Sequence, residues 1–206
     1  MKTDEMQVVV FEWRGANAIL SKWLAGFPRV RRMRREAGYQ ATDCLAAWRN
    51  QAVKWFLKET DKAWLLMLDD DIVPLKETGV LLACEADIAG CHFFSKNGCE
   101  GHGEDGHISM AASKLSRRAL QTIAPPWFAF GFNADGTEMV QCECDYFTAK
   151  ARAAGFHPVK AGLVGHIVPA VMIPGEEGKA KLKFLSQLEN ITAPEKEKSM
   201  VQGGVA

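Results

Sequence analysis

The sequence lacks the features that mark membrane, secreted and strongly charged proteins. No apolar stretch approaches the roughly 18 residues that a bilayer-spanning helix needs, and residues 1–6 carry two acids in place of an apolar leader. Charge of one sign is also missing, because 25 Lys and Arg residues balance 25 Asp and Glu residues. This balance argues against a chain that binds polyanions over its whole surface, although a local patch could do so.

Cysteine is present but sparse. The six cysteines lie at positions 44, 84, 91, 99, 142 and 144, without the dense framework of a small disulfide-rich domain, so we expect reduced thiols and a cytoplasmic protein. The chain has 206 residues, of which 48% are hydrophobic and 24% charged, and it contains no internal repeat. This composition is typical of a globular protein with a core of its own.

Hydrophobic patterning predicts strands that alternate with helices. Strands are expected over 8–11, 63–68 and 88–94, with one or two more over 159–171, and helices over 43–58, 74–84, 114–123 and 142–154. Thr42 or Asp43 would cap the first of these helices, and the glycine-rich stretch 95–106 reads as a loop. The order favours an α/β sandwich with a mixed, mostly parallel central sheet.

A change of composition divides the chain near Pro174. Residues 1–174 carry the α/β pattern and are predicted to form one domain. In residues 175–206, Leu182, Leu185 and Leu188 predict an amphipathic helix, followed by a polar tail. We therefore expect a single α/β domain with a C-terminal helical tail.

An acidic triplet, Asp69-Asp70-Asp71, directly follows the apolar run 63–68. Three adjacent carboxylates at the end of a buried strand repel one another, which predicts a cation beside them. Ligands of open α/β sheets bind outside the carboxyl ends of the strands, where a divalent ion could bridge a phosphate. The alternative is that one aspartate caps the next helix while the others are solvated.

Other charged residues fall where they could join this site. On the helix 43–58, Arg49 lies in the apolar stripe and needs an anionic partner, either a bound nucleotide or a carboxylate on the sheet. Glu143 and Asp145 begin the helix 142–154, where they could stabilise the helix dipole or supply a general base. His166 could be a metal ligand or a core histidine.

Taken together, these segments resemble GT-A glycosyltransferases, especially the compact family 2-like enzymes often found in phages and prophages. The resemblance covers about residues 5–173. It rests on five segments in the order of the family: Trp48 to Val53, Leu66 to Ile72 with the DxD motif, Pro126 to Phe128, Cys144 to Phe147, and Gly165 to Ile167.

The resemblance implies a Rossmann-like nucleotide-binding fold and a role for each matching residue. Arg49 and Asn50 would contact a nucleotide sugar, with a UDP-sugar as the expected donor, together with Asp69 and Asp70. Asp69, Asp71 and His166 would hold Mn²⁺ or Mg²⁺, and Asp145 would be the catalytic base. The implied reaction transfers the sugar to an acceptor hydroxyl, with inversion at the anomeric carbon.

The chain departs from the family in two places that concern the base and the acceptor. The family commonly has Glu-Asp where this chain has Cys144-Asp145, so Glu143 is a second candidate base. The acceptor is open, with nucleic acid and saccharide as the first candidates and protein as a third. Its candidate contacts are Trp127 and part of a run of five arginines within residues 29–35, namely Arg31, Arg32, Arg34 and Arg35. The sequence gives this run no clear secondary structure beyond a helix or a loop.

Two further readings compete with this one. The segment 68–73 also resembles the nucleophile strand of haloacid-dehalogenase-type phosphotransferases, in which Asp69 would be phosphorylated. A binding module stabilised by zinc could instead use Cys91, His92, Cys99, His102 and His107, although their spacing matches no common zinc finger.

Overall fold

The computed structural model describes residues 3–13, 15–34, 45–92, 108–167, 170–174 and 180–184. Seven strands form one sheet in the order β2-β1-β3-β6-β5-β9-β4. Five of them run in the same direction, whereas β6 and β4 are antiparallel to their neighbours. The strands are β1 (Met6–Glu12), β2 (Val30–Arg34), β3 (Trp64–Asp69), β4 (Ile72–Pro74), β5 (Ile88–His92), β6 (Ala112–Ser116) and β9 (Val159–His166). The predicted mixed, mostly parallel α/β sheet is confirmed.

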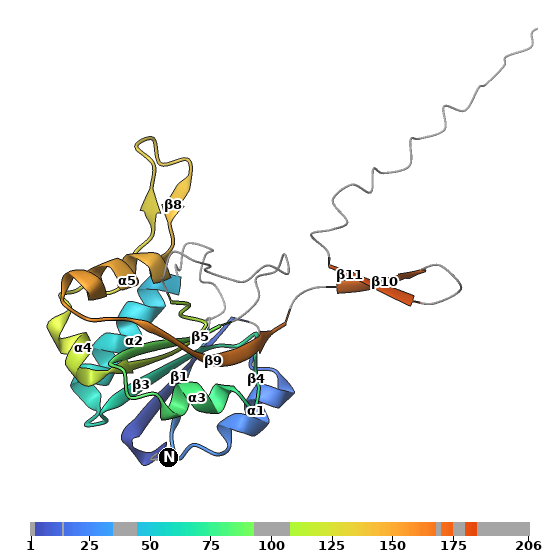
Figure 1. Ribbon diagram of the computed structural model, residues 1–206, viewed down its shortest axis with the longest axis horizontal. Coiled ribbons are helices and arrows are strands. Elements are labelled where there is room, and N and C mark those ends of the chain that lie inside the picture. Colours follow the sequence, from blue (N-terminus) through green and yellow to red (C-terminus); the bar gives the residue numbers. More distant parts are fainter. Residues whose placement is uncertain are drawn as a thin grey trace, which may run out of the picture. The chain divides into compact units, whose positions relative to one another are not determined.

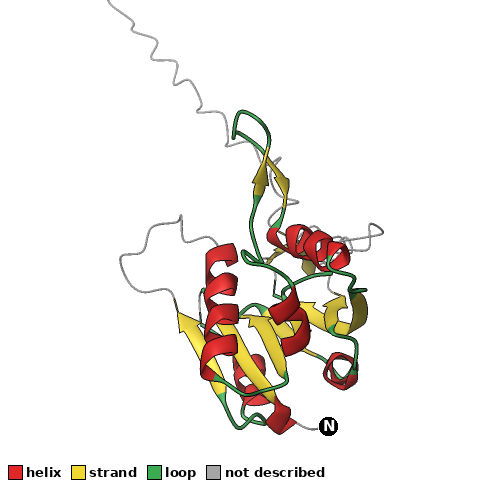
Figure 2. Cartoon of the chain, turned by 90° about the vertical axis from the view of Figure 1, so that its left-hand side faces the viewer, coloured by secondary structure: helices red, strands yellow, loops and turns green. Residues whose placement is uncertain are grey.

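Helices cover both faces of the sheet, as Figures 1 and 2 show. One face packs against α2 (Leu45–Glu59), α4 (Arg117–Thr122) and α5 (Glu143–Ala153), and the other against α1 (Ala18–Leu24) and α3 (Thr78–Ala83). A single-turn 3₁₀ helix, Thr3–Glu5, precedes β1. Each described helix is too short or too polar to cross a bilayer.

Strand β3 explains why its sequence is a continuous apolar run. Leu65 and Met67 belong to the core on the α2 side, whereas Leu66 and Leu68 belong to the core on the α1 side. Because successive side chains of a strand point to opposite faces, a strand covered on both faces must be apolar throughout. The strand therefore ends where Asp69 introduces charge.

The helices predicted over 74–84 and 114–123 begin later than expected. Pro74 does not open a helix but ends β4, an edge strand, where its missing N–H costs no ladder bond; α3 begins at Thr78. Residues 112–116 form β6 in the centre of the sheet, and Ser116 caps α4 by accepting a hydrogen bond from the N–H of Ala119 at 3.0 Å. Burial between β3 and β5 overrides the helical pattern predicted from Lys114 onward.

Gly162 allows β9 to approach α3 closely. Its φ is +78°, and a Cβ at this position would lie 2.5 Å from the carbonyl oxygen of Glu77. Only glycine adopts this conformation readily and leaves room for that backbone. Strand β9 also pairs with β4, with Ile72 opposite His166.

Two hairpins complete the described structure. Strands β7 (Gly131–Phe132) and β8 (Met139–Gln141) project as a hairpin just before α5 (Figure 1). Strands β10 (Ala170–Pro174) and β11 (Ala180–Phe184) pair with each other in a second unit, Val168–Ala206, whereas the sheet belongs to the unit Met1–Ile167. The helix predicted around Leu182 is wrong at 180–184, where Lys and Leu alternate with the period of a strand.

Several predictions lie outside the described residues. They are the cap at Thr42 or Asp43, the loop 95–106, and the continuation of the predicted tail helix to Leu185 and Leu188. The remaining helix predictions agree closely with the structure: α2 covers 45–59 where 43–58 was expected, and α5 covers 143–153 where 142–154 was expected.

Candidate functional site

Polar and charged side chains gather where the parallel strands end. Strands β1, β2, β3, β5 and β9 all point to the same edge of the sheet, and their last residues are Glu12, Arg34, Asp69, His92 and His166. Ligands of open α/β sheets bind outside this edge. The carboxyl edge of the sheet is therefore the expected position of a ligand-binding or catalytic site.

The acidic triplet forms the tight connection between β3 and β4. Its main chain is held by Asn17, whose side-chain amide donates to the carbonyls of Asp70 at 3.2 Å and Ile72 at 2.7 Å. The same Asn17 side chain caps α1 by accepting from the N–H of Leu20 at 2.9 Å. Asp70, predicted to bind the nucleotide, has a buried side chain. The shape of the triplet is thus set by a residue about 50 positions earlier.

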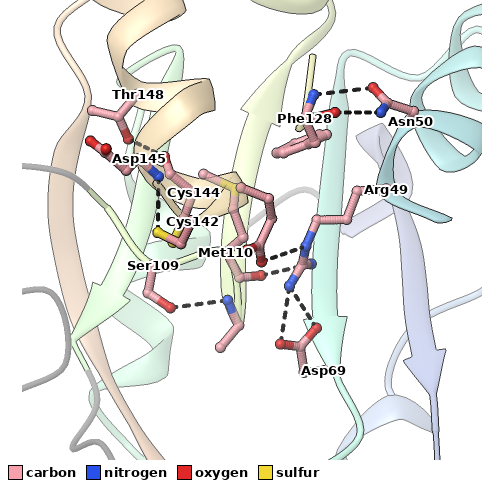
Figure 3. A network of polar contacts seen from close by, with 12 residues as sticks. Arg49, Asn50, Asp69, Ser109, Met110, Phe128, Cys142, Cys144, Asp145 and Thr148 are labelled. Carbon is pink, nitrogen blue, oxygen red and sulfur yellow. Dashed lines mark hydrogen bonds and ion pairs between the residues drawn. The ribbon is translucent and has the colours of Figure 1, made fainter. Parts of the chain in front are cut away.

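Arg49 is only 1% exposed, as its predicted position in the apolar stripe of the helix requires, and it lies beside Asp69. Its Nη2 donates to both carboxylate oxygens of Asp69, at 3.0 and 3.1 Å, and its Nη1 donates to the carbonyl of Met110 at 3.1 Å (Figure 3). Nε lies 3.6 Å from Oε1 of Glu143, and the guanidinium lies 5.0 Å from the centre of the Phe11 ring. The anionic partners of Arg49 in this structure are therefore carboxylates.

The environment of Asp69 makes its charge costly. Burial, together with the negative charges of Asp71 and Glu143, raises its pKa to about 6 even though Arg49 acts in the opposite direction. One guanidinium does not offset the desolvation and the two neighbouring acids. A further cation beside Asp69 would stabilise its ionised form.

His166 meets the triplet through the pairing of β9 with β4. Because His166 is opposite Ile72 in that pairing, its Nε2 lies 3.1 Å from Oδ2 of Asp71. The N–H of the next residue, Ile167, donates to the carbonyl of Asp71 at 2.7 Å. The carboxylate of Asp71 and the imidazole of His166 thus lie together although the two residues are 95 positions apart in the chain.

This donor set fits a divalent cation in part. A carboxylate oxygen and an imidazole nitrogen are ligands that suit Mn²⁺, whereas Mg²⁺ prefers oxygen alone. Asp71 and His166 lie together, but Asp69 does not complete a compact group of three ligands with them, because its oxygens face Arg49. Of the three predicted metal ligands, the structure brings two together and holds the third beside them.

The two candidate bases, Glu143 and Asp145, lie in the first turn of α5 but have different surroundings. Glu143 is nearly buried, with 11% of its side chain exposed, and faces Arg49. Asp145 is half-buried and points away from Arg49 and Asp69 in Figure 3. Cys142 caps the helix, and its Sγ accepts from the N–H of Asp145 at 3.4 Å. The two acids thus lie in different surroundings despite being two residues apart.

Two residues expected to bind ligands have structural partners. The side chain of Asn50 accepts hydrogen bonds from the N–H groups of Trp127 and Phe128 and donates to the carbonyl of Phe128 at 2.7 Å. Trp127 is 5% exposed, and its indole N–H donates to the carbonyl of Leu120 at 2.9 Å. These contacts account for both residues without a nucleotide or an acceptor.

The arginine run forms the edge strand β2 and not the helix or loop that was expected. Arg32 and Arg34 both pair with Glu12, which is 3% exposed, and they lower its pKa against the effect of burial. Arg31 stacks 4.3 Å from the centre of the Trp55 ring. Arg35 lies outside the described residues. Two of the arginines assigned to an acceptor are therefore already neutralised within the protein.

The geometry disfavours the two alternatives, a phosphotransferase that uses Asp69 and a binding module stabilised by zinc. A phosphorylated Asp69 would need an accessible carboxylate, yet both of its oxygens accept hydrogen bonds from Arg49. For the zinc module, Cys91 is buried and burial raises its pKa to about 12, which disfavours the thiolate that zinc requires. Three of the other proposed ligands, Cys99, His102 and His107, lie outside the described residues.

Sequence reasoning missed the roles of Asn17 and Cys142. An asparagine just before an apolar segment is an N-cap signal, and it could have been found at Asn17. Nothing in the sequence pairs that cap with the main chain of the triplet. Cys142 caps a helix through sulfur, which is not among the usual capping groups, so its position gave no signal.

Comparison with known proteins supports the fold. No protein-family model matches the chain, and no curated protein matches it. Among solved structures, A197 from STIV is similar with a TM-score of 0.56 and 17% identity, over 86% of this chain and 93% of that one. A glycosyltransferase involved in the glycosylation of the major capsid of PBCV-1 has a TM-score of 0.39 and 13% identity, over 59% of this chain and 68% of that one. The first likeness shows a shared fold, and the second is too low to carry an argument.

Proposed function

We propose that this protein is a metal-dependent glycosyltransferase that moves a sugar from a nucleotide-sugar donor, with a UDP-sugar as the first candidate, to an acceptor hydroxyl. The observation that carries the proposal is the meeting of Asp71 and His166 at the carboxyl edge of a mixed α/β sheet, next to Asp69. A site that raises the pKa of one acid and joins a second to an imidazole is suited to a dication and a pyrophosphate.

Asp71 and His166 would hold the metal, Mn²⁺ in preference to Mg²⁺, with Asp69 next to them. When bound, the ion would neutralise charge that develops on the diphosphate leaving group. Arg49, predicted to contact the nucleotide directly, is too deeply buried in this structure to offer its guanidinium to solvent. We assign it the positioning of Asp69, through the hydrogen bonds to both carboxylate oxygens.

Asp145 is the better candidate for the base. Glu143 is nearly buried beside the guanidinium of Arg49, which limits the access of an acceptor hydroxyl to its carboxylate. Asp145 is half-buried and turned away from that pair, which leaves it able to take the proton of an acceptor hydroxyl. In this assignment Glu143 helps to position Arg49. Inversion at the anomeric carbon is part of the proposal and rests on the family resemblance alone.

The acceptor is either a saccharide or a nucleic acid, and the pairing of Arg32 and Arg34 with Glu12 reduces the positive charge available for a polyanion. Binding of duplex DNA measured at low and high salt separates the two classes. A phosphate-binding site weakens steeply as the salt concentration rises.

A thermal-shift screen tests the function. UDP, other nucleoside diphosphates and nucleotide sugars are added with and without Mn²⁺, and the proposal expects a nucleotide to raise the melting temperature only when the metal is present. Asp145→Asn should keep this shift and lose sugar transfer, whereas the matched variant Glu143→Gln should retain part of the transfer. The absence of a metal-dependent shift with every nucleotide would overturn the proposal, and full activity of Asp145→Asn would move the base elsewhere.

A further inference from the structure

The first turn of α5 holds a pair of cysteines that the proposed function does not use. Sγ of Cys142 and Sγ of Cys144 lie 2.9 Å apart within hydrogen-bond distance, and neither is in a disulfide (Figure 3). Cys142 is half-buried, whereas Cys144 is only 3% exposed. The partly accessible thiol of Cys142 is thus in contact with the buried thiol of Cys144.

We propose that Cys142 and Cys144 form a reversible dithiol–disulfide site, oxidised by small disulfides of the glutathione class. The proposal rests on the contact between the two sulfur atoms and on the position of Cys142 as the N-cap of α5. The N-terminus of a helix stabilises a thiolate, which is the nucleophile in disulfide exchange.

The surroundings give the two thiols different roles. The hydrogen bond from Cys144 is the main cause that lowers the pKa of Cys142 to about 7, with a further contribution from the N–H of Asp145. The same contact, together with burial, raises the pKa of Cys144. Cys142 is therefore the attacking thiol and Cys144 the resolving one.

The exchange balances in two steps. The Cys142 thiolate attacks one sulfur of glutathione disulfide, forming a mixed disulfide and releasing one glutathione thiolate. Cys144 then loses its proton to solvent and attacks Sγ of Cys142, which releases the second glutathione. Two protein thiols are oxidised by two electrons and one glutathione disulfide is reduced to two thiols. A lowered pKa of the attacking thiol favours the first step, and the short distance between the sulfurs favours the second.

A metal is the other occupant that this cluster could take, because ligand atoms of Cys142, Glu143 and Cys144 all lie within 4.8 Å of one another. Two features disfavour it. The carboxylate of Glu143 already faces the guanidinium of Arg49, so a dication would be placed next to a positive charge. Structural zinc sites also use four protein ligands, and the cluster offers three.

Peptide mapping of the whole protein tests the proposal. Cleavage after Arg118 and Lys150 isolates residues 119–150, which contain Cys142 and Cys144 and no other cysteine. Reduced protein is treated with glutathione disulfide, alkylated and digested at Lys and Arg, and the masses of the peptides are measured by mass spectrometry. The expected product is this peptide lighter by two hydrogens and closed to alkylation, and dithiothreitol should restore both thiols.

Three variants assign the roles. Cys144→Ser should accumulate glutathione on Cys142, because the resolving thiol is missing. Cys142→Ser, which retains a good helix cap, should form neither product. Cys84→Ser, a half-buried cysteine outside the pair, should behave as the unchanged protein.

Two results would overturn the proposal. One is alkylation of both cysteines after treatment of the unchanged protein with glutathione disulfide. The other is protection of the pair by added zinc alone, with one zinc retained per chain. Neither result depends on whether the protein transfers sugars.

Discussion

The two edges of the sheet each bury a cation, Arg49 at the carboxyl edge and Lys114 toward the amino edge, but the cations have different partners. Lys114 is 3% exposed, and its Nζ donates to the carbonyls of Leu82 at 2.9 Å and Cys84 at 2.5 Å and lies 4.1 Å from the Trp64 ring centre. These carbonyls belong to the end of α3, where a lysine is a common cap. Arg49 instead faces Asp69 and Glu143.

Two hollows lie at the amino edge. One of about 740 Å³ is lined by Gln7, Val30, Trp55 and their neighbours, and another of about 620 Å³ by Met6, Trp64 and Lys114. Acids line both hollows, but Glu59, Asp61 and Glu85 are exposed and Glu5 is half-buried, whereas Glu143 beside Arg49 is buried. The comparison teaches that the partners of a buried cation indicate its role: main-chain carbonyls around Lys114 serve the fold, whereas acids around Arg49 mark a candidate site for chemistry.

Removing the cation at the carboxyl edge should have the largest effect. Arg49→Leu leaves Asp69 and Glu143 without their counter-charge, and breaking a buried ion pair costs about 3–5 kcal/mol of unfolding free energy. Urea denaturation measures this loss. Arg117→Leu is the control, because Arg117 donates to Thr60 and to main-chain carbonyls between Phe56 and Lys62, so its removal leaves no acid without a counter-charge. A loss below 1 kcal/mol in Arg49→Leu would contradict the difference between the edges.

The second prediction concerns binding and not stability. Asp71→Ala removes the carboxylate that meets His166, and we expect Mn²⁺-dependent nucleotide binding to weaken by about 100-fold or more. Isothermal titration with UDP and Mn²⁺ measures the change. Asp61→Ala, an exposed acid at the amino edge, provides the matched control and should bind as before. Equal affinities in the two variants would exclude Asp71 from the site.

The raised pKa of Asp69 predicts a pH dependence of stability. Because its pKa is about 6 in the folded chain and 3.8 ordinarily, the folded state holds this proton more tightly than the unfolded state. Its contribution to stability is complete below the unfolded pKa of about 4 and is lost as the pH rises through 6, a change of about 3 kcal/mol in metal-free protein. Urea titrations across this range in unchanged protein and Asp69→Asn measure it. The variant cannot titrate there, so identical profiles would contradict the assignment.

The smallest effect is expected at the amino edge. Lys114→Met retains the apolar stem but removes two hydrogen bonds to carbonyls, which should cost about 1 to 2 kcal/mol of unfolding free energy. Nucleotide binding should be unchanged, because Lys114 does not contact the acidic triplet. Thermal unfolding with and without UDP and Mn²⁺ measures both quantities, and a loss of the ligand shift alone would reverse the roles of the two edges.

Much of the fold could be predicted from patterns that do not depend on distant contacts. The apolar run of β3 and the periodicity of α2 mark their elements directly, and Gly155, with a φ of +84°, follows the end of α5. Strand β6 could not be predicted from its sequence, because a lysine and two serines are not the residues expected in a central strand, and the Oγ of Ser113 is buried without a hydrogen-bond partner. Ser113 is completely buried there, and Lys114 reaches the end of α3.

The candidate site was predictable where one helix or strand fixes the residue. The wheel correctly put Arg49 in the apolar face of its helix, and the position of Asp69 follows from the end of β3. Whether Arg49 meets a carboxylate or a nucleotide was left open, since that depends on how α2 and α5 pack. The sequence likewise could not separate Glu143 from Asp145, because their difference arises from the direction in which the first turn of α5 faces.

Gly162 lies close to the backbone at the start of α3 and does not contact the acidic triplet, but it helps to set the position of the strand that carries His166. Any larger side chain at this position would collide with the backbone near Glu77 and push the strand outward. The imidazole four residues later would move with it and part from Asp71. Gly162→Ala should therefore mimic the loss of His166 in nucleotide binding while every ligand-bearing side chain stays intact, which makes the spacing between a helix and a strand as much a determinant of the site as its acids.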